Sequence, residues 1–329
     1  MTGAGGTEAA GDLRCAAQMR AAGADPIGTA GSYDGYLLVE WSRPWPRDLA
    51  EIPELAPVRA ALDDHRRRTG ATIRLQGLVP DAADRRRVVL HRRDGGPFAA
   101  YTRSEWDASA PASLAADGAR PPTEPVEVGR RLGRAAAALL AGEPGTSTAY
   151  NRDVLVCTHG RRDRCCGSWG TELWQELSTL DLGDDVRLWR TSHTGGHRYA
   201  ATMVVLPEGT AWGFADAGSA MRVLRRDGPV TEVLAGYRGC AGMPSPAVQS
   251  LERAVLAEVG WSLLDTPRTG EDLGAGRVAL TTYPEGAAQR WEATVTAGRT
   301  LAVPECGALP AGAGKTSVEQ VVTEITRPA

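Results

Sequence analysis

Two segments that carry thiol and imidazole side chains each follow an apolar stretch, and this arrangement constrains the fold more than any other feature of the chain. The first segment begins at the end of residues 153–157 and holds three cysteines, and the second follows residues 186–190 and holds two histidines. These side chains are Cys157, Cys165, Cys166, His193 and His197. Both apolar stretches have the composition of buried strands. If the two strands are neighbours in one sheet, the thiols and imidazoles converge, so we expect an α/β protein.

The pattern along the rest of the chain predicts the same order of elements twice. In the first half we expect strands at residues 36–41, 72–78, 87–91 and 98–101, with a helix at 57–68. A Pro-rich segment at 108–125 and a helix at 126–141 follow. In the second half we expect strands at 153–157, 186–190, 199–206 and 211–214, with helices at 171–177, 217–226 and 247–259. Further strands are expected within 270–304, and a short helix from Thr316 onward.

This repetition indicates an internal duplication. The segment 38–40 matches 155–157, with Glu40 in the place of Cys157, so only the second half is expected to bind a metal. The predicted parts are an N-terminal α/β half without metal ligands at 1–145, a metal-binding domain at 146–265 and a small C-terminal β extension at 266–329.

Composition excludes several classes of function. The net charge of -3 argues against a general nucleic-acid binder, whose surface would be strongly basic. The chain has no run of eighteen apolar residues and no signal-peptide pattern at its N-terminus, so we expect a cytoplasmic protein without a membrane partner. In a reducing cytosol the six cysteines are expected to bind metal, react or pack as thiols, and not to form a disulfide framework.

The surroundings of the cysteine segment favour thiolate, which is the form that binds metal. The segment lies between a predicted strand and a helix, whose N-terminal dipole attracts negative charge. Arg161, Arg162 and Arg164 add positive charge and are expected both to neutralise a bound centre and to attract an acidic redox partner.

Two Cys and two His fit either zinc or an iron-sulfur site of the Rieske type. Eight residues separate Cys157 from Cys166, whereas zinc fingers space paired cysteines by about two to four residues. The longer spacing favours a loop around a larger cluster.

These motifs resemble the sucrase/ferredoxin-like family, which includes thioredoxin-like 2Fe-2S ferredoxins. The resemblance covers most of residues 15–261 and rests on Cys157-x8-Cys166, Ser192-His193-x3-His197-Arg-Tyr-Ala, 206–213, 237–239, 28–30 and 37–41. It implies a thioredoxin-like ferredoxin domain preceded by a second thioredoxin-like half.

The resemblance also implies one 2Fe-2S cluster. Cys157 and Cys166 would hold one iron, and His193 and His197 the other. Cys166 is preferred to its neighbour Cys165 by spacing, although Cys165 is itself capable of ligation. The implied function is electron transfer with an unidentified redox partner protein, coupled to proton uptake by an imidazole. No pair of carboxylates can be singled out for the glycoside chemistry that the word sucrase suggests.

Two alternatives stay open. One is a structural zinc protein that binds a partner, and the other is a thioredoxin-like oxidoreductase that uses Cys165 with Cys166 or Cys157, although the Cys-x-x-Cys pair is missing. His65 and His91 are interpreted as solvated, and His159 as an exposed loop histidine, with a spare ligand or a proton donor near the cluster as the alternative. Cys15, Cys240 and Cys306 lack partners at metal spacing and are interpreted as core or surface thiols, with a redox role as the alternative for Cys240.

Overall fold

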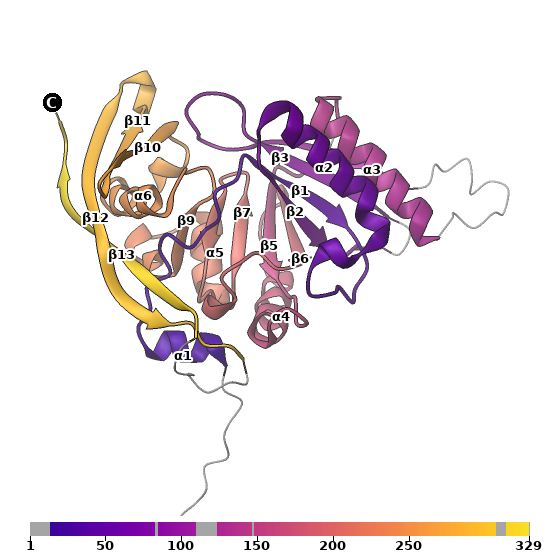
Figure 1. Ribbon diagram of the computed structural model, residues 1–329, viewed down its shortest axis with the longest axis horizontal. Coiled ribbons are helices and arrows are strands. Elements are labelled where there is room, and N and C mark those ends of the chain that lie inside the picture. The colour runs from indigo at the N-terminus through magenta and orange to yellow at the C-terminus, as the bar shows by residue number, and fades with distance from the viewer. Residues whose placement is uncertain (1–13, 83–84, 110–123, 147, 307–313, 329) are drawn as a thin grey trace, which may run out of the picture.

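The computed structural model describes residues 14–82, 85–109, 124–146, 148–306 and 314–328. The described part of the chain forms a mixed α/β structure with a nine-stranded sheet and a separate four-stranded sheet (Figure 1). The strand order of the large sheet is β4-β3-β1-β2-β6-β5-β7-β8-β9, and that of the small sheet is β10-β11-β12-β13. The α/β class expected from the sequence is therefore correct.

The first half contributes four strands and two long helices. Its elements are β1 (Gly35–Glu40), α2 (Ala56–Thr69), β2 (Ile73–Leu78), β3 (Arg87–Arg92), β4 (Thr102–Asp107) and α3 (Pro125–Ala141). Strand β1 pairs parallel with β2 and antiparallel with β3, which pairs antiparallel with β4. Alternate residues of β1 enter different cores, since Leu37 packs under α2 and α3 whereas Leu38 joins the larger core. Burial on both faces explains why this strand is a continuous apolar run.

The second half repeats this strand order. Its elements are β5 (Arg152–Cys157), α4 (Arg164–Ser178), β6 (Val186–Thr191), β7 (Met203–Leu206), β8 (Thr210–Trp212), α5 (Ala217–Arg225), β9 (Tyr237–Cys240) and α6 (Pro246–Val259). Strand β5 pairs parallel with β6 and antiparallel with β7, which pairs antiparallel with β8. The order β2-β1-β3-β4 of the first half thus corresponds to β6-β5-β7-β8 of the second.

The two halves meet where β2 lies beside β6 in the large sheet. Leu78 pairs with Thr191 across this junction. Asp153, near the opposite end of β5 from Cys157, is fully buried and accepts hydrogen bonds from Arg103 at 2.7 Å and Trp189 at 2.7 Å, with His91 at 2.8 Å. Because His91 and Arg103 belong to the first half, this buried network ties the halves together.

The C-terminal sheet packs against α6 and extends toward the N-terminal helix α1 (Cys15–Ala21). It consists of β10 (Arg268–Gly274), β11 (Arg277–Thr282), β12 (Gln289–Ala302) and β13 (Thr316–Thr326). The long strands β12 and β13 run along one side of the molecule to α1 (Figure 1). Arg299 of β12 donates to the carbonyl oxygens of Ala22 at 3.1 Å and Gly23 at 2.6 Å, which fixes the two ends of the chain together.

Several expectations about single elements are wrong. The expected short helix after Thr316 is the strand β13, which pairs antiparallel with β12. The hairpin partner of β3 is β4, because Phe98 leaves the hairpin to bridge Arg268. Helix α4 begins at Arg164, so Cys165 and Cys166 lie in its first turn. The Pro-rich segment expected to separate the halves lies largely outside the described residues.

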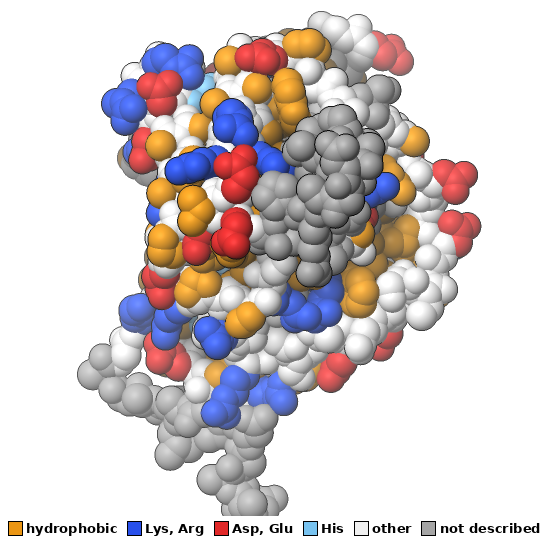
Figure 2. Space-filling model, turned by 90° about the vertical axis from the view of Figure 1, so that its right-hand side faces the viewer, with side chains coloured by type: hydrophobic (Ala, Val, Ile, Leu, Met, Phe, Trp, Pro, Cys, Tyr) orange, Lys and Arg blue, Asp and Glu red, His pale blue; other side chains and the backbone are white. Residues whose placement is uncertain are grey.

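The side of the molecule formed by α2 and α3 carries mixed charge. Figure 2 shows basic and acidic side chains interspersed on this face. Asp64 pairs with Arg67 and Arg68 on α2, and Glu127 pairs with Arg130 on α3, at the spacings of neighbouring helix turns.

In the part of the chain that the structure describes, no helix combines the length and apolar character needed to cross a membrane.

Candidate metal centre

The cysteine and histidine segments start at the adjacent ends of two parallel strands. Cys157 is the last residue of β5 and lies in register with Thr191, the last residue of β6. His193 follows two residues later. The carboxyl ends of parallel strands meet at one edge of a sheet, where ligand sites of α/β proteins commonly form. The two strands are therefore neighbours, as the sequence argument required.

Helix α4 brings further thiols to this edge. The Asp163 side chain caps the helix by accepting a hydrogen bond from the Cys165 backbone N–H at 2.8 Å. Gly170 lets the helix approach β5 closely, because a Cβ atom there would lie 1.9 Å from the carbonyl oxygen of Cys157. Cys165 and Cys166 consequently sit in the first turn, where the helix dipole favours thiolate.

Three of the four predicted ligands converge. Donor atoms of Cys157, Cys166 and His193 all lie within 4.8 Å of one another. Contact with Cys166 and with His193 holds the pKa of Cys157 well below its ordinary value, while contact with Cys157 and burial raise the pKa of Cys166. His193 Nδ1 is buried without a hydrogen-bond partner. A thiolate, a thiol and an orphaned imidazole nitrogen form a donor set suited to a metal.

His197 lies beside this group but outside the 4.8 Å set. Its ring centre is 6.0 Å from that of His193, and its Nδ1 lies 2.9 Å from Asp163 Oδ2. Burial opposes ionisation of Asp163, but the bonds from His197 and from the Cys165 backbone prevail and lower its pKa to about 2. A carboxylate on one ring nitrogen is the usual support for a metal-binding histidine, which leaves Nε2 as the ligand atom.

The structure therefore brings three of the four predicted ligands into one set and leaves His197 beside it. The structure places Cys166, and not Cys165, next to Cys157.

The loop between the two histidines is shaped around a buried arginine. Arg238 donates to the carbonyl oxygens of Gly195 at 3.3 Å and Thr29 at 2.6 Å. Gly196 has φ +66°, and a Cβ atom there would lie 2.4 Å from Arg238 Cζ. Glycine is needed at this position for both its conformation and its lack of a side chain.

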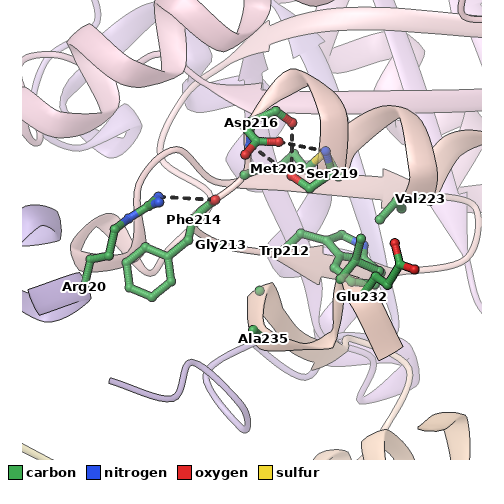
Figure 3. Close-up of a pocket in the computed structure, with 13 residues that line it drawn as sticks. Arg20, Met203, Trp212, Gly213, Phe214, Asp216, Ser219, Val223, Glu232 and Ala235 are labelled. Atoms are coloured by element: carbon green, nitrogen blue, oxygen red, sulfur yellow. Dashed lines mark hydrogen bonds between the residues drawn. The ribbon is translucent and has the colours of Figure 1, made fainter. Parts of the chain in front are cut away.

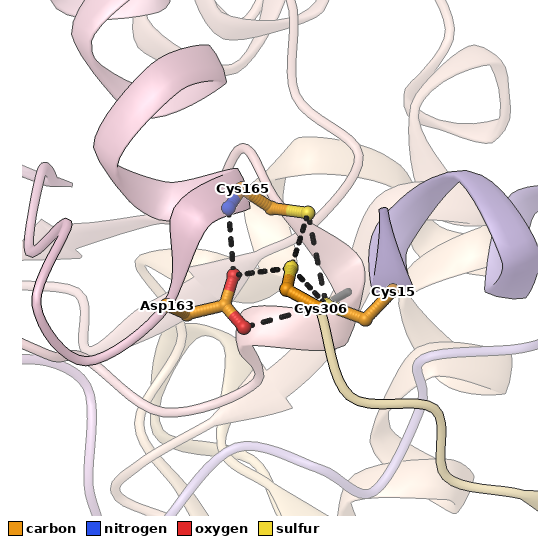
Figure 4. A group of neighbouring side chains, drawn as sticks. All are labelled: Cys15, Asp163, Cys165 and Cys306. Atoms are coloured by element: carbon orange, nitrogen blue, oxygen red, sulfur yellow. Dashed lines mark hydrogen bonds between the residues drawn. The ribbon is translucent and has the colours of Figure 1, made fainter. Parts of the chain in front are cut away.

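A second group of potential ligands lies directly beside the first and was missed by the sequence analysis. Figure 4 shows this three-cysteine group, which consists of Cys15, Asp163, Cys165 and Cys306. Cys15 and Cys165 form a hydrogen bond between their sulfurs, which lowers the pKa of Cys165 to about 6. Cys15 and Cys306 are 291 residues apart in the chain, and no spacing rule could have joined them. Both are free thiols, Cys15 buried and Cys306 partly exposed, and the structure adds that they lie next to Cys165.

The histidines interpreted as solvated are buried. His91 is hydrogen-bonded to Asp153, and His65 lies on the buried side of α2. His159 is buried with Nε2 2.8 Å from the carbonyl oxygen of Pro46 and its ring edge against Trp45. Neighbouring charges had suggested exposure, but tertiary partners decide the burial of each ring.

A basic cleft opens next to the candidate centre. His193, His159 and Ser192 are among its lining residues. Five arginines also line it, namely Arg47, Arg59, Arg66, Arg74 and Arg162. Arg74 donates to the carbonyl oxygen of His193 at 3.1 Å, so positive charge reaches the histidine loop itself.

Another pocket lies beside β8 and is also lined by Arg20 of α1. Its polar groups bond to one another: Arg20 donates to the carbonyl oxygen of Phe214 at 3.3 Å, and Asp216 accepts from the Ser219 N–H at 2.7 Å (Figure 3). None of the described residues that line it is a cysteine or a histidine. The chemistry-bearing side chains are those at the ends of β5 and β6.

The fold and the site thus define an α/β protein with a thiol and imidazole centre at one edge of its sheet. The chain belongs to the sucrase/ferredoxin-like family, whose model matches residues 26–239. It is also 38% identical over 58 residues to a protein of Meyerozyma guilliermondii called altered inheritance of mitochondria protein 32. That match covers 16% of this chain and 21% of the other protein. No solved structure matches the chain.

Proposed function

We propose that this protein transfers electrons by means of one 2Fe-2S cluster bound to the four predicted ligands. The observation that carries the proposal is the convergence of Cys157, Cys166 and His193 at the ends of two parallel strands, with a buried and unpartnered His193 Nδ1. Membership of the sucrase/ferredoxin-like family supports it.

Each ligand has a defined part in the proposal. Cys157 and Cys166 hold one iron, and His193 and His197 hold the other. The bound cluster supplies a site that accepts and releases one electron. Asp163 orients His197 through its Nδ1, as carboxylates do for metal-binding histidines.

The repeated strand order supports a thioredoxin-like fold for both halves. In this proposal the first half carries no metal and supports the second through the shared sheet. Cys157 and Cys166 are fully buried, whereas His193 and His197 are partly exposed, so a partner would approach from the histidine loop.

The redox partner is proposed to be an acidic protein in the cytoplasm. The five arginines of the basic cleft surround the approach to His193. Complementary charge speeds association and orients the partner, and its effect falls as salt screens it.

The experiment is metal analysis of the full chain purified without oxygen. We expect a red-brown protein with about two iron and two sulfide per chain. Protein that takes up only zinc after reconstitution with iron and sulfide would favour the structural zinc alternative instead. Turnover with dithiols and no bound metal would favour the oxidoreductase.

Proton coupling is tested by the reduction potential. An imidazole bound through one nitrogen keeps a second that can bind a proton, and reduction adds negative charge that favours this proton. The potential is therefore expected to fall as pH rises, by at most about 59 mV per pH unit. A potential that is constant with pH would remove proton coupling from the proposal without removing the cluster.

A further inference from the structure

The strongest feature outside the proposed cluster site is the three-cysteine group. Its members come from three segments: α1, the N-cap and first turn of α4, and the chain that follows β12. Cys15 and Cys165 are fully buried, and Asp163 is nearly so. Three thiols and one carboxylate within 4.8 Å of one another form a complete donor set for a four-coordinate ion.

The distances within the group match those of a tetrahedral ion. The sulfur of Cys165 lies 3.7 Å from that of Cys15 and 3.3 Å from that of Cys306, and the sulfurs of Cys15 and Cys306 are 3.5 Å apart. Zinc ligands at about 2.3 Å for sulfur and about 2.0 Å for oxygen place sulfurs about 3.8 Å apart and sulfur and oxygen about 3.5 Å apart. The Cys15 sulfur is 3.5 Å from Asp163 Oδ2 and the Cys306 sulfur is 3.5 Å from Asp163 Oδ1, so either oxygen of the carboxylate lies near a thiol of the group.

We propose that the three-cysteine group is a second metal site, which binds one Zn²⁺ ion and is structural. Binding replaces the protons of the three thiols, so each ion bound releases up to three protons and leaves three thiolates and one carboxylate on the metal. No electron is transferred. All four positions are filled by protein, which is the pattern of structural and not of catalytic zinc.

The position of the site gives the ion a function. It would join α1 and the segment after β12 to the start of α4, where Cys166 begins the neighbouring ligand set. Asp163 also bonds His197, so the same carboxylate connects the two sites. The ion is therefore expected to hold α1 and the segment after β12 against the loops that carry the proposed cluster ligands.

The test measures zinc and iron together in the full chain purified without oxygen and under reducing conditions. We expect about one zinc per chain in the wild type, independent of whether iron is present. Cys306→Ser should lower zinc affinity by more than about 100-fold, since loss of an outer partner alone costs about 10-fold to 100-fold. Cys306 is partly exposed, so this change leaves the core intact.

Cys240→Ser is the matched control. Cys240 is a buried thiol whose sulfur bonds the Glu208 carbonyl and the Gly242 N–H, contacts that a hydroxyl can make, and it belongs to neither ligand group. This variant should keep both metals. Zinc retained at the wild-type level in Cys306→Ser and in Cys15→Ser would overturn the proposal.

X-ray absorption at the zinc edge identifies the ligands directly. The proposal predicts three sulfur atoms and one oxygen around zinc, with Zn–S near about 2.3 Å. Two sulfur and two nitrogen atoms would place the ion on Cys157, Cys166 and the histidines, and would overturn it. Failure of the proposed function is a different result, namely a protein that holds zinc in the three-cysteine group but no iron.

Discussion

The two halves of the molecule place very different side chains at the same point of the same strand arrangement. Glu40 ends β1 and Cys157 ends β5, each in parallel register with the last residue of the next strand, Leu78 or Thr191. Both side chains are fully buried. In the first half, Arg87 neutralises the carboxylate at 2.6 Å and its backbone N–H donates to the same group at 2.7 Å.

In the second half, the thiols at this position contact one another and an imidazole. Cys166 and His193 both lie in contact with Cys157. Strand β6, which follows in the chain, leads into the loop with the two histidines. The same strand arrangement thus carries an ion pair in one half and a group of potential metal ligands in the other. Donor chemistry at the strand end and in the following loop decides whether the position is structural or reactive.

The largest expected effect is a loss of iron, which we expect for substitutions at the end of β5 but not at the end of β1. Cys157→Ser or Cys166→Ser should abolish the iron centre, because serine oxygen is a poor ligand for iron in place of thiolate. Glu40→Gln should keep it. Iron content and visible absorption measure the difference, and an iron content unchanged in Cys166→Ser but lost in Cys165→Ser would reverse the ligand assignment.

Glu40 is expected to matter for stability instead. Glu40→Ala removes the partner of a buried Arg87 and should lower the free energy of unfolding by about 3 kcal/mol, in the range for a broken buried ion pair. Urea unfolding monitored by circular dichroism measures this loss. A change below about 1 kcal/mol would show that Asp81, which also contacts Arg87, replaces Glu40.

The junction between the halves should respond to acid. Burial raises the pKa of Asp153, but His91 and Arg103 outweigh it and lower that pKa below its ordinary value. A carboxyl with a lowered native pKa stabilises the fold above its unfolded pKa of about 3.9 and loses this contribution as pH falls through the native pKa. The free energy of unfolding should therefore fall below about pH 5.

Asp153→Asn is the variant for this prediction. It should weaken stability at neutral pH and flatten the acid dependence, because the group that titrates is gone. Urea unfolding at a series of pH values checks both effects. An equally steep acid dependence in the variant would assign it to other carboxylates.

A pair of glycines gives the smallest expected difference between the halves. Gly70 after α2 and Gly196 in the histidine loop both have positive φ, but only Gly196 has a side chain, that of Arg238, in its Cβ position. Gly70→Ala should cost about 1 kcal/mol of unfolding free energy from backbone strain alone. Gly196→Ala should cost about 2 kcal/mol or more and reduce iron retention. Equal costs would show that Arg238 moves aside freely.

The sequence predicted those parts of the fold and site that depend on local pattern. Apolar runs located β1, β5 and β6, and the Cys and His segments after them gave the candidate ligands. Contacts between distant segments were not accessible in this way. The three-cysteine group joins residues from both ends of the chain, and the burial of His91 depends on Asp153, which lies 62 residues away. The strand β13 was missed because its partner β12 decides its conformation.

The central claim is that two cysteines and two histidines hold one cluster, and nitrogen hyperfine spectroscopy of the reduced protein tests it most directly. Electron paramagnetic resonance detects an unpaired electron on a reduced 2Fe-2S cluster, and nitrogen bound to iron couples to it. We predict two strongly coupled nitrogens in the wild type, and loss of one of them in His193→Cys and of the other in His197→Cys. A reduced cluster without strongly coupled nitrogen would contradict the account.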